Sequence, residues 1–364
     1  IVRLVNVLIS RALDMRASDI HFEPFGSSFH VRCRVDGVLY DLDQPPKAMQ
    51  AAIISRLKLM ANLNIAERRL PQDGRIKIKF GNRQVDIRLS TAPTIYGESV
   101  VLRLLSQDTV DYDLNLLGMD PEQLVLIEEL IERPYGMILV TGPTGCGKST
   151  TLATIIERIN QTYRRHILTI EDPIEFIYKR RKSLISQREI GVHSESFHAA
   201  LKSATRSSAD VILVGEMRDI ETISLAITAA ETGSIVFGTL HTQSCAQAIS
   251  RMIDVFPADR QAQIRNMISA SLKGVVSQLL LKRADARGRV PIVEMLFGAP
   301  ALSHIIREGK AYQIHSYIES SEGERTLNQS RDSSLYQFLM KGLISPEQAH
   351  QLARDKNKFA PFLK

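Results

Sequence analysis

The glycine-rich segment at 142–149 constrains this chain most. It reads Gly-Pro-Thr-Gly-Cys-Gly-Lys-Ser and directly follows the apolar run 137–140. This order predicts a buried strand, a glycine-rich turn and then a helix. In such a turn the backbone N–H groups cradle phosphate oxygens, Lys148 reaches the β- and γ-phosphates, and the Ser149 hydroxyl binds Mg²⁺. The segment therefore predicts a nucleoside triphosphate site inside an α/β domain.

Composition is that of an ordinary globular protein. The chain has 364 residues, 44% hydrophobic and 24% charged, which favours two domains. It contains no run of 18 apolar residues and no visible signal peptide, so no transmembrane helix is predicted. The chain opens at Ile1 without a methionine, so a missing N-terminal module stays an open alternative.

Cysteine spacing indicates the redox compartment of the protein, and net charge limits the kinds of partner it could bind. Cys33, Cys146 and Cys245 lie far apart, which argues against a disulfide framework or a cysteine-rich zinc site and favours a reducing cytoplasm. The net charge of +6 is compatible with nucleic acid or an anionic membrane as a partner and proves neither. The basic run 179–182 is interpreted as a solvated loop, with a nucleic-acid or lipid patch as the alternative.

The first part of the chain, 1–106, predicts an α+β domain with an antiparallel sheet. Helical spacing of apolar residues and alternating segments succeed one another there. Helices are predicted at 2–15 and 46–63, strands at 29–35, 75–80, 85–89 and 100–105, and turns at 36–37 and 81–82.

A polar stretch, 107–120, predicts a linker, and the order of predicted elements changes after it. From 121 to 364, strand and helix alternate, which implies a parallel sheet covered on both faces. The stretch from about 300 to 364 is expected to form short helices. The predicted strands are 137–141, 167–171, 211–215 and 235–240, and the predicted helices are 121–133, 150–160, 196–205, 219–232 and 258–278.

Three segments at the carboxyl ends of these strands carry groups for hydrolysis, where ligands bind in open α/β sheets. The first, 169–175, ends in carboxylates that include Glu175. The second places Glu216 at the tip of an apolar strand, as the best candidate to position water and accept its proton. The third brings His241 to a strand end, where it could sense the γ-phosphate. An acidic solvent loop, a capping glutamate and a structural histidine are the alternatives.

Arginines of the first part of the chain are a fourth group of candidate site residues. Alternation places Arg75 on one face of its strand together with two lysines, and Arg88 and Arg103 lie on neighbouring strands. Fixed guanidiniums can neutralise phosphate charge. A basic solvated sheet face is the alternative interpretation.

Several motifs resemble the secretion ATPase superfamily, the hexameric motors of type II secretion and of type IV pilus extension and retraction. The resemblance covers nearly the whole chain, in order. Its motifs are GPTGCGKSTTL, TIEDPIEF, ILVGEMRD, TAAETGSIVFGTLHT, ASDIHFEP, RVDGVL, LPQDGRI and STAPTIYGESVVLRLL.

The resemblance implies a PAS-like N-terminal domain, a RecA-like ATPase domain and a homo-hexameric ring that binds ATP and Mg²⁺. Catalytic roles then go to Lys148, Glu175, Glu216, His241, Arg75, Arg88 and Arg103. Ser149 and Glu216 are the Mg²⁺ candidates, the latter through water. Nucleotide-binding candidates are Gly142, Pro143, Thr144, Gly145, Cys146, Gly147, Lys148, Ser149 and Thr150, with Arg218 and Arg251 as weaker ones.

The resemblance also implies a partner and a place in the cell. A motor of this kind acts on an inner-membrane platform protein of a pilus or secretion machine, from the cytoplasmic face of the bacterial inner membrane, as a peripheral protein. Secretion and pilus-assembly relatives carry a four-cysteine zinc module where this chain has 282–289, so no zinc is expected. The missing module and the segment 300–310 resemble retraction motors, whereas the motifs HFEP and PQDGRI resemble secretion and pilus-assembly motors. Of these alternatives a retraction-type motor is favoured. A nucleic-acid translocase is the alternative, although the chain lacks Trp and shows no basic-aromatic interleaving. A nucleotide-switched scaffold is a third.

Overall fold

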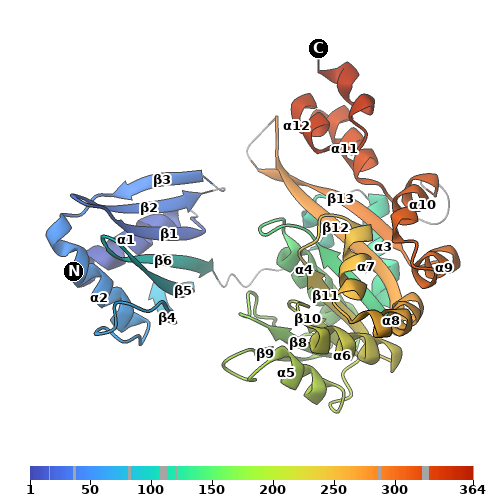
Figure 1. The fold of residues 1–364 in the computed structure, drawn as a ribbon, viewed down its shortest axis with the longest axis horizontal. Helices are drawn as coiled ribbons and strands as arrows, with labels where there is room; N and C mark the ends of the chain where they lie inside the picture. The colour runs from blue at the N-terminus through green and yellow to red at the C-terminus, as the bar shows by residue number, and fades with distance from the viewer. Residues whose placement is uncertain are drawn as a thin grey trace. The chain divides into compact units, whose positions relative to one another are not determined.

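The computed structural model describes residues 1–15, 17–35, 38–80, 83–106, 113–119, 121–285, 288–321 and 328–363. The chain divides into two compact units. The first is formed by Ile1–Thr109 together with Glu175–Ile177, and the second is formed by Val110–Ile174 and Tyr178–Lys364. Both units can be followed along the chain in Figure 1. The predicted turns at 36–37 and 81–82 lie outside the described residues, as do 107–112 and 120 of the predicted linker.

The first unit is a six-stranded sheet with two helices. The strand order is β3-β2-β1-β6-β5-β4, and every neighbouring pair is antiparallel. The strands are β1 (Asp19–Pro24), β2 (Phe29–Val35), β3 (Val38–Asp43), β4 (Gln72–Phe80), β5 (Arg83–Thr94) and β6 (Gly97–Ser106). The helices are α1 (Val2–Asp14), the short 3₁₀ turn η1 (Lys47–Met49) and α2 (Gln50–Met60).

The core of this unit lies between the helices and one face of the sheet. Helical spacing brings Val5, Leu8, Ile9 and Ala12 of α1 to the same side, where they are fully buried with Leu57 of α2. Alternation does the same for each strand, as in β2, where Val31 and Cys33 are buried. The opposite face of the sheet is therefore left to polar and charged side chains.

Most predicted elements of the first unit are confirmed, with two omissions. The antiparallel sheet and helix 2–15 are present, and helix 46–63 is shorter than predicted because a 3₁₀ turn opens it and Met60 closes it. Strands β1 and β3 were not predicted. In β1 the buried Ile20 and Phe22 alternate with His21 and Glu23, so the pattern is visible but only six residues long.

The second unit is built on a seven-stranded sheet in the order β13-β12-β7-β11-β10-β8-β9. All pairs are parallel except β12 with β13. The strands are β7 (Gly136–Thr141), β8 (His166–Glu171), β9 (Leu184–Glu189), β10 (Val211–Val214), β11 (Ile235–Leu240), β12 (Leu272–Lys282) and β13 (Arg289–Phe297). The helices up to β12 are α3 (Pro121–Glu132), α4 (Lys148–Thr162), α5 (Phe197–Ala204), α6 (Ile220–Glu231), α7 (Cys245–Asp254) and α8 (Ala258–Ser271).

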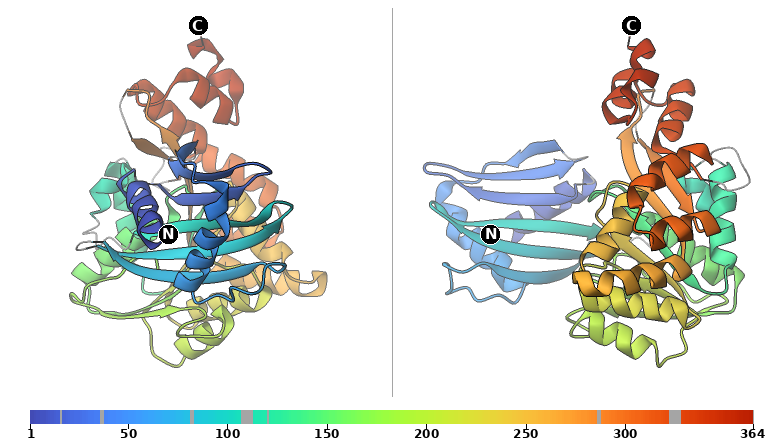
Figure 2. Two further views of the ribbon diagram at one scale, coloured as in Figure 1. Left: turned by 90° about the vertical axis from the view of Figure 1, so that its left-hand side faces the viewer. Right: turned by 45° about the vertical axis from the view of Figure 1, so that its right-hand side comes forward.

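Both faces of this sheet are covered, as the apolar runs predict. In β7, Met137 and Leu139 belong to a cluster with α5, α6, α7 and α8, whereas Ile138 and Val140 belong to a cluster with α3 and α4. Helices thus sandwich the central strands, as Figures 1 and 2 show. The carboxyl ends of β7, β10 and β11 lie at one edge, because these strands are parallel neighbours.

One predicted helix of this unit is wrong in its last third. The sequence predicts a helix over 258–278, but α8 ends at Ser271 and β12 begins at Leu272. Gly274 and the β-branched pair Val275 and Val276 favour the strand, and β12 fits beside β7 in parallel register. The predicted parallel sheet is mixed, because β13 pairs with β12 in antiparallel register. Strands β9, β12 and β13 and helix α7 were not predicted.

Short helices follow β13, in agreement with the prediction for about 300–364. They are α9 (Pro300–Arg307), α10 (Ile314–Ser320), α11 (Arg331–Met340) and α12 (Pro346–Leu352), with 3₁₀ turns η3 (Ala311–Gln313), η4 (Lys356–Lys358) and η5 (Ala360–Phe362). Helices α11 and α12 pack on the distal part of the β12–β13 hairpin (Figure 2).

The described part of the predicted linker, 113–119, contains the 3₁₀ turn η2 (Leu114–Leu117). Leu114 and Met119 are buried there with α3 and α4, so this part packs on the second unit. Among the described residues, no helix has the length and apolar character that crossing a membrane requires.

Candidate functional site

The predicted phosphate loop joins β7 to α4. Three of its glycines, Gly142, Gly145 and Gly147, have φ values of 146°, 79° and 91°, a region that side chains with a Cβ rarely adopt. A Cβ on Gly145 would meet no atom within 4 Å, so the middle of the loop is open. Helix α4 begins at Lys148, and the N–H groups of its first turn have no acceptor within the helix. The loop therefore forms a cradle of backbone donors for an anion.

Lys148 lies across this cradle. Its Nζ donates to the carbonyl oxygens of Gly142 and Pro143 at 2.8 and 3.1 Å. The ammonium is also 3.5 Å from Nδ1 of His241. The cation is thus held over the loop, within reach of a bound phosphate. Ser149 and Thr150 occupy the next two positions of α4.

Glu216 and His241 meet at the carboxyl ends of β10 and β11. Nε2 of His241 lies 3.0 Å from Oε1 of Glu216, and the same oxygen accepts a hydrogen bond from Nε of Arg218. The Glu216 side chain is 21% exposed, whereas His241 is 45% exposed. The hydrogen bond with Glu216 raises the pKa of the Arg218 guanidinium. Together with Lys148, these groups form a continuous polar cluster beside the phosphate loop.

Threonines fasten the strand ends beneath this cluster. Oγ1 of Thr141, the last residue of β7, donates to the carbonyl of Thr242 at 2.7 Å and accepts from its N–H at 3.0 Å. Thr239 in β11 donates to the carbonyl of Gly215, which follows β10. These bonds hold the glutamate and histidine segments in fixed register with the strand that enters the phosphate loop.

Two other residues, Glu175 and Arg251, were predicted to belong to this site. Glu175 is half-buried on the loop after β8. Arg251 is exposed in the last turn of α7, about 9 Å along the helix axis from its first residue. Their proposed contacts with nucleotide stay predictions.

The predicted arginines of the first unit form a row across its sheet. Arg75 is the direct cross-strand partner of Arg88, and Arg88 is the partner of Arg103. The row continues through Asp19 to Arg34. Direct partners point to the same face of a sheet, and neighbouring strands are about 4.8 Å apart. Nε of Arg103 donates to Oδ1 of Asp19 at 3.1 Å. The structure therefore groups the three guanidiniums that the sequence singled out.

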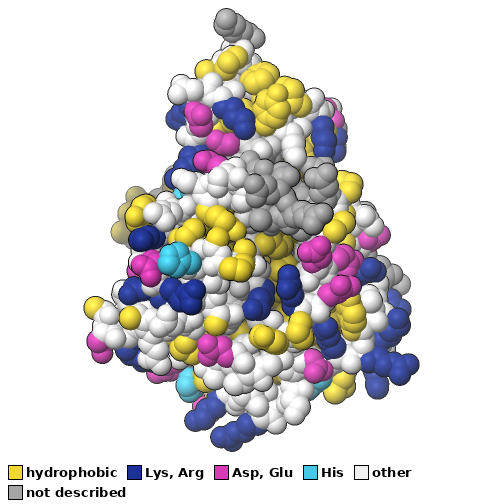
Figure 3. Space-filling view, turned by 90° about the vertical axis from the view of Figure 1, so that its right-hand side faces the viewer, with side chains coloured by type: hydrophobic (Ala, Val, Ile, Leu, Met, Phe, Trp, Pro, Cys, Tyr) yellow, Lys and Arg dark blue, Asp and Glu magenta, His cyan; other side chains and the backbone are white. Residues whose placement is uncertain are grey.

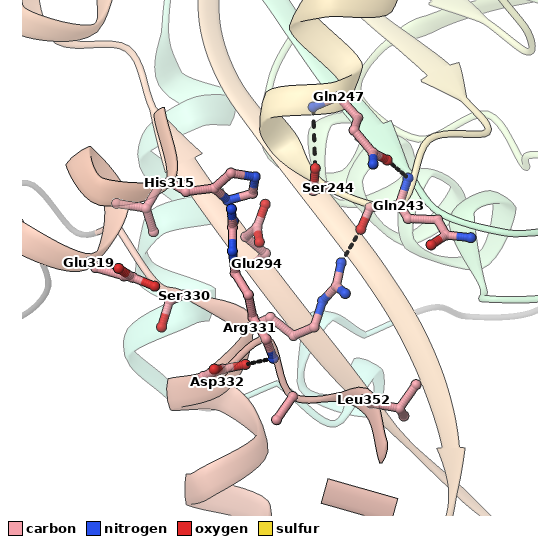
Figure 4. A pocket seen from close by; sticks show the side chains of 13 residues that line it. Gln243, Ser244, Gln247, Glu294, His315, Glu319, Ser330, Arg331, Asp332 and Leu352 are labelled. Carbon is pink, nitrogen blue, oxygen red and sulfur yellow. Dashed lines mark hydrogen bonds between the residues drawn. The ribbon is translucent and has the colours of Figure 1, made fainter. Parts of the chain in front are cut away.

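A cavity of about 270 Å³ lies at the other side of the histidine segment (Figure 4). Its walls come from the starts of α7 and α11, from β13, from α10 and from the end of α12. Arg331 crosses it and donates to the carbonyl of Gln243, two residues after His241. No residue of the phosphate loop, all of which the structure describes, lines this cavity. The Arg331 hydrogen bond connects the segment after His241 to the C-terminal helices.

The donor set around the loop fits a nucleotide with Mg²⁺. Mg²⁺ keeps several waters and takes one or two protein ligands besides phosphate oxygens. The hydroxyl of Ser149 and the carboxylate of Glu216 are of the right type. In the described part of the chain, no group of three or more His, Cys, Asp or Glu side chains is arranged to hold a metal by itself. Burial raises the pKa of the Cys146 thiol, which favours its neutral form.

Residues 1–294 match the family model described as type II/IV secretion system protein. The chain is a member of the type II/IV secretion system protein family. This confirms the resemblance drawn from the motifs.

Two curated relatives show how this family member compares with longer proteins. The type II secretion system protein E of Xanthomonas campestris pv. campestris is 45% identical over 285 residues, which are 78% of this chain and 48% of that protein. The twitching motility protein of Neisseria gonorrhoeae is 52% identical over 235 residues, which are 65% of this chain and 62% of that protein. The chain spans about half the length of the type II secretion relative.

Among solved structures, the pilus retraction motor PilT with bound ADP superposes with a TM-score of 0.76 at 35% identity. The match covers 96% of this chain and 97% of that one. The predicted fold class, a RecA-like ATPase domain with an N-terminal PAS-like α+β domain, is confirmed by the likeness to structures of this family.

Several residues of the site were missed in the sequence. Asp19 lies in the motif ASDIHFEP, which was noted without a role for its carboxylate. Gln278 contacts the phosphate loop, but its segment was predicted as helix, so no signal pointed to it. Thr141 ends the predicted strand 137–141 and Thr242 follows the predicted strand 235–240, and their pairing depends on the neighbouring positions of β7 and β11.

Proposed function

We propose that this chain binds ATP with Mg²⁺ and hydrolyses it to ADP and phosphate. The observation that carries the proposal is the contiguous cluster of Lys148, His241 and Glu216 beside a glycine-rich loop at a helix start. Mg²⁺ would neutralise charge on the β- and γ-phosphates. The family membership and the likeness to an ADP-bound motor support the same activity.

Each side chain has a distinct role in this proposal. Lys148 leaves the loop carbonyls and contacts the β- and γ-phosphates. Glu216 orients the attacking water and accepts its proton, and His241 connects Glu216 to Lys148, so that it responds to the γ-phosphate. Glu175 assists with water or metal. The row of Arg75, Arg88 and Arg103 supplies positive charge that neutralises the charge developing on the triphosphate.

We further propose that the ATPase is a subunit of a hexameric motor. It would act on an inner-membrane platform protein of a type IV pilus or type II secretion machine, at the cytoplasmic face of the membrane. A retraction-type pilus motor is favoured among these. Support comes from the 52% identity with a twitching motility protein and from the likeness to PilT over 96% of the chain.

A nucleic-acid translocase is not favoured. The family match points to secretion and pilus proteins. On the face of the second unit drawn in Figure 3, Lys and Arg side chains are interspersed with Asp and Glu. A phosphate backbone would instead be matched by a stripe of one sign.

Phosphate release by the purified chain tests the proposed reaction. We expect hydrolysis that requires Mg²⁺, that Lys148→Ala abolishes, and that single-stranded DNA does not stimulate. Absence of hydrolysis in the presence of Mg²⁺, at all protein concentrations, would overturn the proposal. Strong stimulation by DNA would instead favour the translocase.

A further inference from the structure

Strand β12 places one glutamine directly behind the phosphate loop. The parallel pairing of β12 with β7 ends at Ser277 and Thr141, so Gln278 follows at the level where the loop begins. Its side chain is 4% exposed. A buried amide has two donors and an acceptor to satisfy, so its partners define its role.

Both ends of this amide contact the nucleotide-binding segment. Nε2 of Gln278 donates to the carbonyl of Cys146 in the loop at 2.8 Å, and Oε1 accepts from Oγ1 of Thr151 in the first turn of α4 at 2.9 Å. The orientation of the amide is fixed, because a carbonyl oxygen can only accept and must face the NH₂ group. One side chain therefore joins the loop to the helix that follows it.

The glycines of the loop pack against the same residue. A Cβ on Gly142 would lie 2.2 Å from the carbonyl oxygen of Gln278, and a Cβ on Gly147 would lie 2.9 Å from its Nε2. The backbone of Gln278 thus shapes the entry of the loop, and its side chain shapes the exit.

We propose that Gln278 is a positioning residue that holds the phosphate loop in its nucleotide-binding conformation. An amide is the side chain that this position requires, since it donates to Cys146 and accepts from Thr151 at once. Glutamate has the same shape but lacks the donor, and leucine has neither group. The inference rests on the proposed nucleotide binding and deepens it.

The expected effect on nucleotide affinity follows from the fraction of molecules whose loop is in the binding-competent conformation. A loop released from these two bonds samples other conformations, and the apparent affinity for nucleotide falls in proportion to the binding-competent fraction. Two buried hydrogen bonds correspond to a change of about tenfold or more in that fraction. Gln278 does not contact the reacting atoms, so the affinity should change more than the turnover of bound ATP.

Calorimetric titration with ADP and Mg²⁺ tests this without requiring hydrolysis. The variants are Gln278→Leu, Gln278→Glu, Thr151→Val and Thr151→Ser. The matched control is Gln261→Leu, because the Gln261 amide also donates to a backbone carbonyl, that of Phe256, but on α8. Thermal unfolding of each variant is measured in parallel.

We expect Gln278→Leu and Gln278→Glu to weaken ADP binding about tenfold or more, and Thr151→Val about threefold to tenfold, whereas Thr151→Ser and the control bind like the wild type. Thr151→Val should add little to Gln278→Leu, because its partner is already gone. If Gln278→Leu does not fold, Thr151→Val against Thr151→Ser decides.

Wild-type affinity in folded Gln278 variants, or equal effects of Thr151→Val and Thr151→Ser, would overturn the inference. A wild type that binds no ADP at all would instead count against the proposed function.

Discussion

At the scale of single residues, Glu216 carries the proposed chemistry. Glu216→Gln keeps the shape of the side chain and an oxygen for His241 and Arg218, but the amide cannot accept a proton. We expect ATP binding to persist while turnover falls about 10²–10⁴-fold. Binding of a fluorescent ATP analogue and phosphate release measure the two properties separately.

The control is Glu221→Gln, whose carboxylate is 73% exposed on α6. It should hydrolyse ATP like the wild type. Hydrolysis by Glu216→Gln at the wild-type rate would contradict the assignment of Glu216 as the general base.

His315 gives a second prediction at this scale. Burial lowers its pKa, and it faces Glu294 on β13, Glu319 on α10, Arg331 on α11 and Arg354 after α12. The unfolded chain therefore binds the proton at a higher pH than the folded chain does. The unfolding free energy should fall as the pH drops below about 6.5.

Urea unfolding at about pH 7.5 and about pH 5.5 measures this dependence. His315→Gln should reduce it without removing it, because burial also lowers the pKa of His21. An unchanged pH dependence in His315→Gln would contradict the prediction.

At the scale of elements, we expect ATP turnover to depend on Asp19 of β1, because this residue contacts the arginine row. Asp19 is buried and accepts from Arg103, so Asp19→Asn should leave that guanidinium less fixed. We expect about a threefold to tenfold loss of ATP turnover, a larger loss for Arg103→Ala, and no further loss in the double variant.

The matched control for this experiment lies on the same strand. Glu23 pairs with Arg32 on the same sheet face, so Glu23→Gln removes a similar ion pair outside the row. Equal losses for Glu23→Gln and Asp19→Asn would show that only the stability of the sheet is being measured.

The same scale shows what the sequence could and could not predict. The phosphate loop, Glu216 and His241 were found because each follows an apolar run that can only be a central strand. Gln278 was not found, because 258–278 has apolar residues at intervals that suit a helix, and only pairing with β7 makes 272–282 a strand. The arginine row needed strand register, which alternation within each strand does not give.

At the scale of the whole molecule, the proposed motor requires assembly. Six copies of the 40.8 kDa chain give a particle of about 245 kDa. We expect native mass spectrometry to detect it with Mg²⁺ and a non-hydrolysable ATP analogue, and ATPase activity per chain to rise with protein concentration. Full activity of a monomer at every concentration would contradict the ring.

Strand β12 has one further consequence. Gln278 serves the nucleotide loop, while its neighbours Leu279 and Leu281 pack with α11 and α12. The two regions are thus chemically linked through adjacent positions of a single peptide. A chimera that imports α11 and α12 from another family member will therefore need to import the β12–β13 hairpin with them, or the graft will disturb the nucleotide loop.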